Sequence, residues 1–109
     1  MIENLRSQMR KGMLEYCILL IVKEKPAYTT EIIEALHKAE MIVVEGTIYP
    51  ILSRMKAAEM LSYYWQESTS GPPRKYFQIT EKGKQLLGEM QREWQQLSKS
   101  INDLQRTKQ

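Results

Sequence analysis

Residues 71–77 read GPPRKYF, and they lead into the second of two segments that each place apolar side chains at alternate positions. Residues 61–65 (LSYYW) and residues 76–80 (YFQIT) contain the aromatic and β-branched residues that strands favour. The connection over residues 68–74 is rich in Ser, Gly and Pro, which predicts a hairpin with a longer loop rather than a two-residue turn. The paired prolines should stiffen the tip of this hairpin.

Three helices are predicted before the hairpin. Residues 3–24 repeat apolar side chains at steps of three and four, which is typical of an amphipathic helix. Thr29 or Thr30 can cap a second helix. A third helix should begin within residues 45–47, because Pro50 has no backbone N–H and is best tolerated in a first turn.

The order helix, helix, helix, hairpin and helix is that of a winged helix-turn-helix. The expected fold class is therefore mostly α with a two-stranded β-hairpin. In this arrangement the third helix enters the DNA major groove, and the hairpin, or wing, lies along the backbone. Residues 1–80 are predicted to form this DNA-binding head, including the N-terminal helix, and residues 81–109 a dimerisation helix.

The face of the third helix that should be exposed suits nucleic acid. No acidic residue lies between Gly46 and Lys56, while hydroxyl groups and an arginine are available for phosphates or base edges. In the wing, Arg74 and Lys75 follow the prolines directly and can neutralise phosphates. The residues predicted to contact DNA from these two elements are Thr47, Tyr49, Ser53, Arg54, Arg74 and Lys75.

Residues 81–109 contain no proline and predict one long helix. Their apolar side chains alternate steps of three and four, which is the a/d repeat of a coiled coil. A helix over residues 81–107 would be about 40 Å long, which is too long for the head to cover, and an open apolar seam is a liability in water. The seam should therefore hold a homodimer together, through Leu87, Met90, Trp94, Leu97, Ile101 and Leu104.

One residue of this seam also suggests a ligand site. Trp94 is wide for an a-type position, where branched aliphatic side chains pack better, so it should leave a cleft beside the adaptable side chain of Met90. Met9, Met13 and Tyr16 lie on the stripe of the first helix that should face this region. Such a lining suits a planar hydrophobic effector between subunits. The alternative is that Trp94 simply fills the dimer core.

The composition bounds other functions. The chain has 109 residues, enough for one domain, and a net charge of +3. No signal peptide is recognised, and the longest apolar run, residues 17–22, is too short to span a bilayer. A cytoplasmic location without membrane contact is therefore expected. Cys17 is the only cysteine, which excludes an internal disulfide and a cysteine-based metal cluster, and no metal or cofactor is expected.

The residues also bear on three other classes of function. Catalysis is not expected, because His37 is the only histidine and no nucleophile–base set, carboxylate pair or phosphate loop is present. A winged helix that binds another protein instead of DNA is the main alternative. It would show an apolar exposed face on the third helix, and Pro50 and Ala57 alone do not make one. Binding of double-stranded RNA is a further alternative.

Five blocks, spread over nearly the whole chain, form a more specific pattern. They are residues 8–15 (QMRKGMLE), 26–28 (PAY), 45–52 (EGTIYPIL), 71–77 (GPPRKYF) and 79–83 (ITEKG). Together they resemble the PadR family of bacterial transcriptional regulators, and the short C-terminal helix resembles its small subfamily. The resemblance implies a winged-helix dimer that represses nearby genes until a small molecule relieves repression. Some members of that subfamily bind planar hydrophobic drugs between the subunits.

The resemblance also implies a DNA contact at the start of the second helix, from Tyr28 and Thr30. Family members often have Tyr-Gly at this place, whereas here Tyr28 is followed by Thr29. This departure puts in question the backbone at the start of the helix and its phosphate contact.

Overall fold

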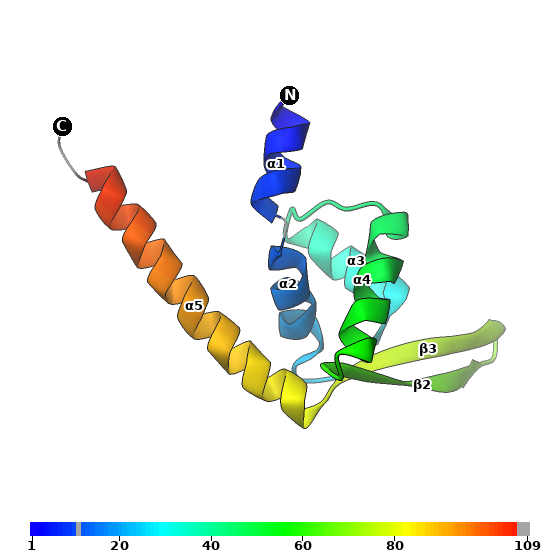
Figure 1. Cartoon of the computed structure of the whole chain (residues 1–109). Helices are drawn as coiled ribbons and strands as arrows, with labels where there is room; N and C mark the ends of the chain where they lie inside the picture. The colour runs from blue at the N-terminus through cyan, green and yellow to red at the C-terminus, as the bar shows by residue number, and fades with distance from the viewer. Residues whose placement is uncertain (11, 107–109) are drawn as a thin grey trace.

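The computed structural model describes residues 1–10 and 12–106. Figure 1 shows a head of helices with the hairpin beside them, from which one long helix extends. The head contains one three-stranded sheet. In chain order the elements are α1 (Ile2–Arg10), α2 (Met13–Val22), β1 (Ala27–Tyr28), α3 (Thr29–Lys38), α4 (Glu45–Ala57), β2 (Leu61–Ser68), β3 (Gly71–Ile79) and α5 (Glu81–Arg106). The predicted fold class is confirmed, although the sheet has one strand more than the hairpin.

The core lies where α2, α3 and α4 pack over the base of the hairpin. Helices α3 and α4 each contribute one apolar side, as the spacing of their apolar residues predicts, whereas α2 is apolar throughout residues 17–22 and is buried or half-buried over that whole run. Among the described residues, those buried include no polar or charged side chain, so burial of apolar surface holds the head together. The most completely buried side chains are Ile18, Leu19, Val22, Ile32, Leu36, Ile48, Leu52, Met55 and Leu61.

The single helix predicted over residues 3–24 is wrong, because α1 and α2 are separate helices. Gly12, which precedes α2, has φ 87°, in the left-handed region where a right-handed helix cannot continue. Lys11 lies outside the described residues. At the end of α1, Nη1 of Arg10 donates a hydrogen bond to the carbonyl of Ile42 at 2.9 Å. This bond ties α1 to the link that precedes α4.

The start of α3 also differs from the prediction. Tyr28, rather than Thr29 or Thr30, is the N-terminal capping residue, and its backbone N–H donates to Oε1 of Glu31 at 3.1 Å. Tyr28 has an extended backbone and forms β1 together with Ala27. This short strand pairs antiparallel with β3, so the sheet has the order β1-β3-β2.

The hairpin strands are longer and the turn is shorter than predicted. Only Thr69 and Ser70 lie in the turn, so the predicted loop over residues 68–74 is wrong. Pro72 and Pro73 belong to β3, beside an irregularity in its register with β2. Prolines are tolerated there because β1 pairs only with the other end of β3, which leaves this part of the strand open on one side.

The predicted apolar face of the hairpin is confirmed. Leu61 pairs with Ile79 and Tyr63 with Phe77, so the four side chains share one face. Leu61 and Phe77 are buried, but Tyr63 is 39% exposed. The wing therefore extends beyond the core from about this point.

Pro50 lies in the second turn of α4, which begins at Glu45, rather than in the first turn as predicted. A proline at this place cannot donate a hydrogen bond to the carbonyl of Gly46, four residues earlier. Both residues are exposed, so water can satisfy that carbonyl. The exposure of this side of α4 is what makes the proline tolerable.

The long helix α5 begins at a joint with the head. Oγ1 of Thr80 donates to the carbonyl of Glu59 at 2.6 Å and accepts the N–H of Gly83 at 2.9 Å. The hydroxyl therefore caps the helix and also attaches it to the segment before β2. Leu87, farther along, is buried in the core of the head.

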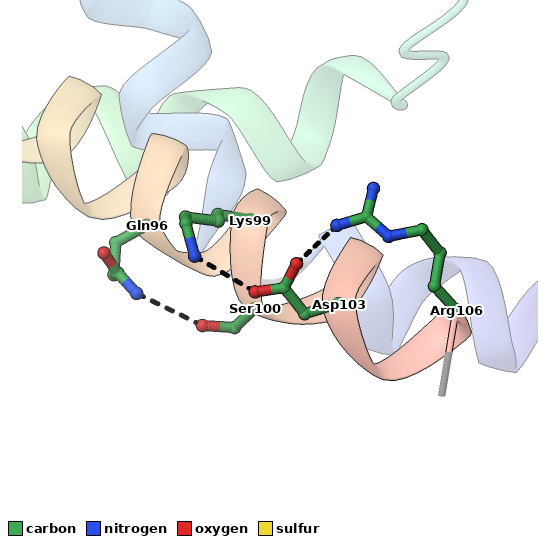
Figure 2. Close-up of polar contacts among 5 residues, drawn as sticks. All are labelled: Gln96, Lys99, Ser100, Asp103 and Arg106. Atoms are coloured by element: carbon green, nitrogen blue, oxygen red, sulfur yellow. Dashed lines mark hydrogen bonds and ion pairs between the residues drawn. The ribbon is translucent and has the colours of Figure 1, made fainter. Parts of the chain in front are cut away.

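The distal part of α5 leaves the head (Figure 1). Figure 2 shows a polar stripe on this part, in which Gln96 donates to Ser100 at 3.3 Å and Asp103 accepts from Lys99 at 3.1 Å and from Arg106 at 2.6 Å. Pairs at these spacings support a helix that has few other contacts, each by about 0.2–0.5 kcal/mol.

The C-terminal segment predicted over residues 81–109 is helical as far as Arg106, and residues 107–109 lie outside the described part. Across residues 1–10 and 12–106, none of the helices combines the length and the apolar character needed to cross a membrane.

We expect Gly83→Ala to lower the free energy of unfolding by about 1–3 kcal/mol. The added Cβ would overlap the carbonyl oxygen of Met60 and lie 2.8 Å from Cγ1 of Ile79. Gly88→Ala is the matched control, because its nearest atom would be Nη1 of Arg92 at 3.8 Å, and it should stabilise the protein by up to about 1 kcal/mol. Urea unfolding followed by circular dichroism measures both changes. Equal effects from the two variants would contradict close packing at Gly83.

Candidate nucleic-acid interface

Helix α4 buries one side and exposes the other. Ile48, Leu52 and Met55 point into the core. The residues predicted to contact DNA from this helix are all exposed, and they are Thr47, Tyr49, Ser53 and Arg54. Short hydroxyl side chains on an exposed helix allow a close approach to base edges and phosphates.

Glu45 was not singled out from the sequence, yet it orients Tyr49. The Tyr49 hydroxyl donates a hydrogen bond to Oε1 of Glu45 at 2.8 Å. This bond, followed by slight burial and the charge of the carboxylate, raises the pKa of the Tyr49 phenol. Because its proton is directed at Glu45, the phenol oxygen faces a ligand as an acceptor, which complements the amino groups of adenine and cytosine.

Arg54 lies at the edge of the exposed face and has a partner on another helix. Its Nη2 is 3.6 Å from Oε1 of Glu15 on α2, and its side chain remains 66% exposed. Ion pairs between exposed groups contribute only about 0–1 kcal/mol. Arg54 can therefore exchange this partner for a phosphate or a base. Glu15 is distant in sequence, so no local pattern reveals the pair.

The two cations of the wing point in different directions. Arg74 and Lys75 are neighbours within β3, so their side chains lie on opposite faces of the sheet. The loop predicted over residues 68–74 gave these two side chains no relative orientation, whereas β3 includes both residues and alternates their directions.

Lys75 lies among aromatic rings on the face that also meets α4. Its Nζ is 4.1 Å from the ring centroid of Tyr63, 5.7 Å from that of Trp65 and 5.6 Å from that of Phe77. Lys56 of α4 approaches the same Tyr63 ring at 5.7 Å. The ammonium group of Lys75 therefore lies near the place where α4 meets the wing.

Arg74 lies on the other face, and the structure brings it together with Tyr28. The Cζ atom of Arg74 is 4.6 Å from the centroid of the Tyr28 ring. Tyr28 itself is half-buried and meets the ring of Tyr76 edge to face at 5.3 Å. Thr30, the other residue predicted at the start of α3, is exposed.

The apolar seam of α5 is divided between the head and solvent. Leu87 belongs to the core of its own chain, because α2 packs against the base of α5. Its assignment to the dimer contact is corrected accordingly. Met90 is half-buried against the same core, and the exposed fractions farther along are 46% for Trp94, 53% for Leu97, 50% for Ile101 and 73% for Leu104.

The residues predicted to bind an effector do not all come together within one chain. Met9 on α1 is 80% exposed and Trp94 on α5 is 46% exposed. Figure 1 shows α1 and the distal part of α5 diverging from the head. Met13, Tyr16 and Met90 are half-buried, and Tyr16 and Met90 pack against the core. Met9 and Trp94 are therefore both open to a further partner in the single chain.

The described residues offer little for metal binding or nucleophilic chemistry. Within them, no group of three or more His, Cys, Asp or Glu side chains is placed to hold a metal ion. Cys17 is half-buried, and burial raises the pKa of its thiol. The thiol therefore stays protonated at neutral pH, where it is a poor nucleophile.

The sequence model of the transcriptional regulator PadR-like family matches residues 18–89. The structure of a PadR-like transcription factor from Bacteroides fragilis is 53% identical, with a TM-score of 0.78 over 93% of this chain and 98% of that chain. A PadR-like transcriptional regulator from Bacillus cereus is 38% identical, with a TM-score of 0.83 over 93% and 99% of the two chains. Bacillus subtilis PadR in complex with operator DNA has a TM-score of 0.67 over 72% of this chain and 46% of that chain; at 18% identity it shows a shared fold.

Proposed function

The chain belongs to the PadR-like family of transcriptional regulators, and we propose that it binds duplex DNA as a homodimer and represses transcription under the control of an apolar effector. The observation that supports DNA binding best is the exposed side of α4, beside an exposed wing. A protein of the same fold, Bacillus subtilis PadR, is found in complex with operator DNA.

In this proposal α4 enters the major groove. Tyr49 and Ser53 face base edges, where the Tyr49 oxygen accepts hydrogen bonds because its proton is held by Glu45. Arg54 can leave its weak pair with Glu15 and donate two bonds to a guanine or a phosphate. Thr47 lies near the N-terminus of α4, where hydroxyl and backbone N–H groups suit phosphate.

The wing and the start of α3 would supply further backbone contacts. Thr30 is exposed in the first turn of α3, where the helix dipole favours an anion. Arg74 and Lys75 lie on opposite faces of β3, so we place their phosphates on different sides of the wing. Lys75 would act together with Lys56, which lies near the same Tyr63 ring.

We expect Arg74→Ala and Lys75→Ala each to reduce the slope of log affinity against log salt by about one unit, because each removes one phosphate contact. The probe is a duplex that the wild-type protein selects from a random pool, and fluorescence anisotropy at several salt concentrations measures affinity. Arg92→Ala, an exposed site on α5, is the control with an unchanged slope. An unchanged slope for both wing variants would remove the wing from the interface.

The homodimer is proposed from the exposed seam. From Trp94 to Leu104, one side of α5 carries large apolar side chains that are about half exposed or more. Such a stripe is stable in water only when it is covered. The hydrogen-bonded polar stripe of Figure 2 lies on a different side of the same helix. Only one side of the distal part of α5 is therefore apolar and available for a contact with another chain. A second copy of the chain is the proposed cover, because two-fold pairs read DNA half-sites.

Replacing Leu97 and Ile101 together by Asp should turn the dimer into a monomer, because two charges without partners would enter an apolar contact. The control replaces Gln96 and Ser100 by Asp, which adds the same charge at the same spacing to the polar stripe of Figure 2. This control should remain dimeric. Sedimentation equilibrium gives the masses. A stable dimer of the Leu97 and Ile101 variant would place the contact elsewhere.

We place the effector between the subunits, where Trp94 and Met90 of α5 and Met9, Met13 and Tyr16 of α1 and α2 would line its site. The exposure of Met9 and Trp94 in the single chain supports this placement. An aromatic ring and flexible thioethers suit a flat apolar molecule. Such a guest alters DNA binding only if it prefers one arrangement of the subunits over the other.

In a Trp65→Phe background one tryptophan remains, so fluorescence reports on Trp94. We expect saturable quenching by at least one member of a panel of planar aromatic compounds, with a parallel loss of affinity for the selected duplex. Trp94→Phe in the otherwise wild-type protein is the control variant. It keeps an aromatic ring at position 94, so a compound can still stack there. If no compound quenches saturably and none changes DNA affinity, Trp94 only packs the dimer.

A further inference from the structure

We propose that Tyr28 is a positioning residue, which holds Arg74 in the orientation in which the wing meets DNA and does not itself contact DNA. The inference rests on the DNA binding proposed above. It differs from the sequence-based expectation, which gave Tyr28 a contact of its own. It is carried by the contacts that meet at the Tyr28 ring, on one face of the sheet.

The backbone of Tyr28 is fixed at two places. As part of β1 it pairs with Tyr76 of β3. As the capping residue of α3 it donates its N–H to Glu31 at 3.1 Å. Tyr28 therefore belongs both to the sheet and to the helix-turn-helix. The position of its Cα is fixed by both elements.

The ring of Tyr28 is held as well. It meets Tyr76 edge to face, with 5.3 Å between centroids and 69° between planes. Tyr76 stacks on Tyr64 of β2, with 5.6 Å between centroids and 8° between planes. The three rings form a row across β1, β3 and β2, and both arrangements are favourable for aromatic pairs.

Arg74 lies at the end of this row. It precedes Tyr76 by two residues on β3, so the two side chains share a face of the sheet. Its Cζ is 4.6 Å from the centroid of the Tyr28 ring, within the range of about 6 Å for a cation–π contact. Arg74 takes part in none of the salt bridges found across the described residues. The ring of Tyr28 is therefore what orients its charge.

A guanidinium held in this way remains able to bind phosphate. When a guanidinium rests its planar face on a ring, its five N–H donors point outward in the plane and remain available. Placement before DNA arrives also reduces the rotamer freedom that the side chain loses on binding. Tyr28 caps α3 and also contacts Arg74. The N–H donors of Arg74 are therefore positioned relative to the helix-turn-helix, and this position does not depend on the tip of the wing.

The test compares two replacements of Tyr28, with the duplex selected by the wild-type protein as probe. Tyr28→Phe keeps the ring and should bind within about twofold of wild type. Tyr28→Leu removes the ring and should bind about threefold to tenfold more weakly. In an Arg74→Ala background, Tyr28→Leu should cause no further loss, because the two residues act through one contact.

Two outcomes would overturn the proposal and leave DNA binding intact. Equal losses from Tyr28→Phe and Tyr28→Leu would mean that the hydroxyl contacts DNA directly. A full loss from Tyr28→Leu in the Arg74→Ala background would mean that Tyr28 acts by another route. If the wild-type protein selects no duplex at all, the proposed function itself fails.

A second measurement needs no variant that is at risk of misfolding. In the wild-type protein without DNA, the ring current of Tyr28 should shift the δ-methylene protons of Arg74 upfield in the NMR spectrum. Tyr28→Phe should preserve that shift. Arg74 protons at unshifted positions in the folded wild type would overturn the proposal.

Discussion

The direction of α5 depends on the joint at Thr80. Its hydroxyl bonds the carbonyl of Glu59 and the N–H of Gly83, and the absence of a side chain at Gly83 lets the helix lie against the carbonyl of Met60. This close approach also brings Leu87 into the core. Because α5 has 26 residues, a tilt of about ten degrees at the joint would move its far end by roughly 7 Å. In the proposed dimer, the distance between the two copies of α4 would therefore be set largely here.

The elements that were predicted correctly are each specified by sequence features that lie inside the element or within a few residues of its ends. Helix α4 begins at Glu45 and α5 runs without a break, because capping and apolar spacing are local. The parts that were missed depend on distant neighbours. A strand of two residues at Tyr28 has no periodicity of its own, and the prolines at 72 and 73 fit β3 only because one of its sides is open there. Gly12 is compatible with a continuous helix or a break, and tertiary context decides between them.

The sequence predicted which residues belong to the candidate site better than it predicted the directions of their side chains. The exposed side of α4 follows from its helical spacing. In the wing, however, Arg74 and Lys75 were expected at the end of a loop, whereas both lie in β3, where neighbouring side chains diverge. The pair between Arg54 and Glu15 joins two helices that are far apart in sequence, so it could not be foreseen. Glu45 could have been, since its partner lies four residues farther along the same helix.

The closure of the core at Leu87 has a genetic consequence for the proposed dimer. The head is complete within one chain, while the exposed seam begins farther along α5. Subunits could then exchange between dimers without unfolding. An allele with a defective wing and an intact seam would enter mixed dimers and interfere with the normal copy, so it would be dominant. An allele with a defective seam would stay apart from the normal copy and be recessive.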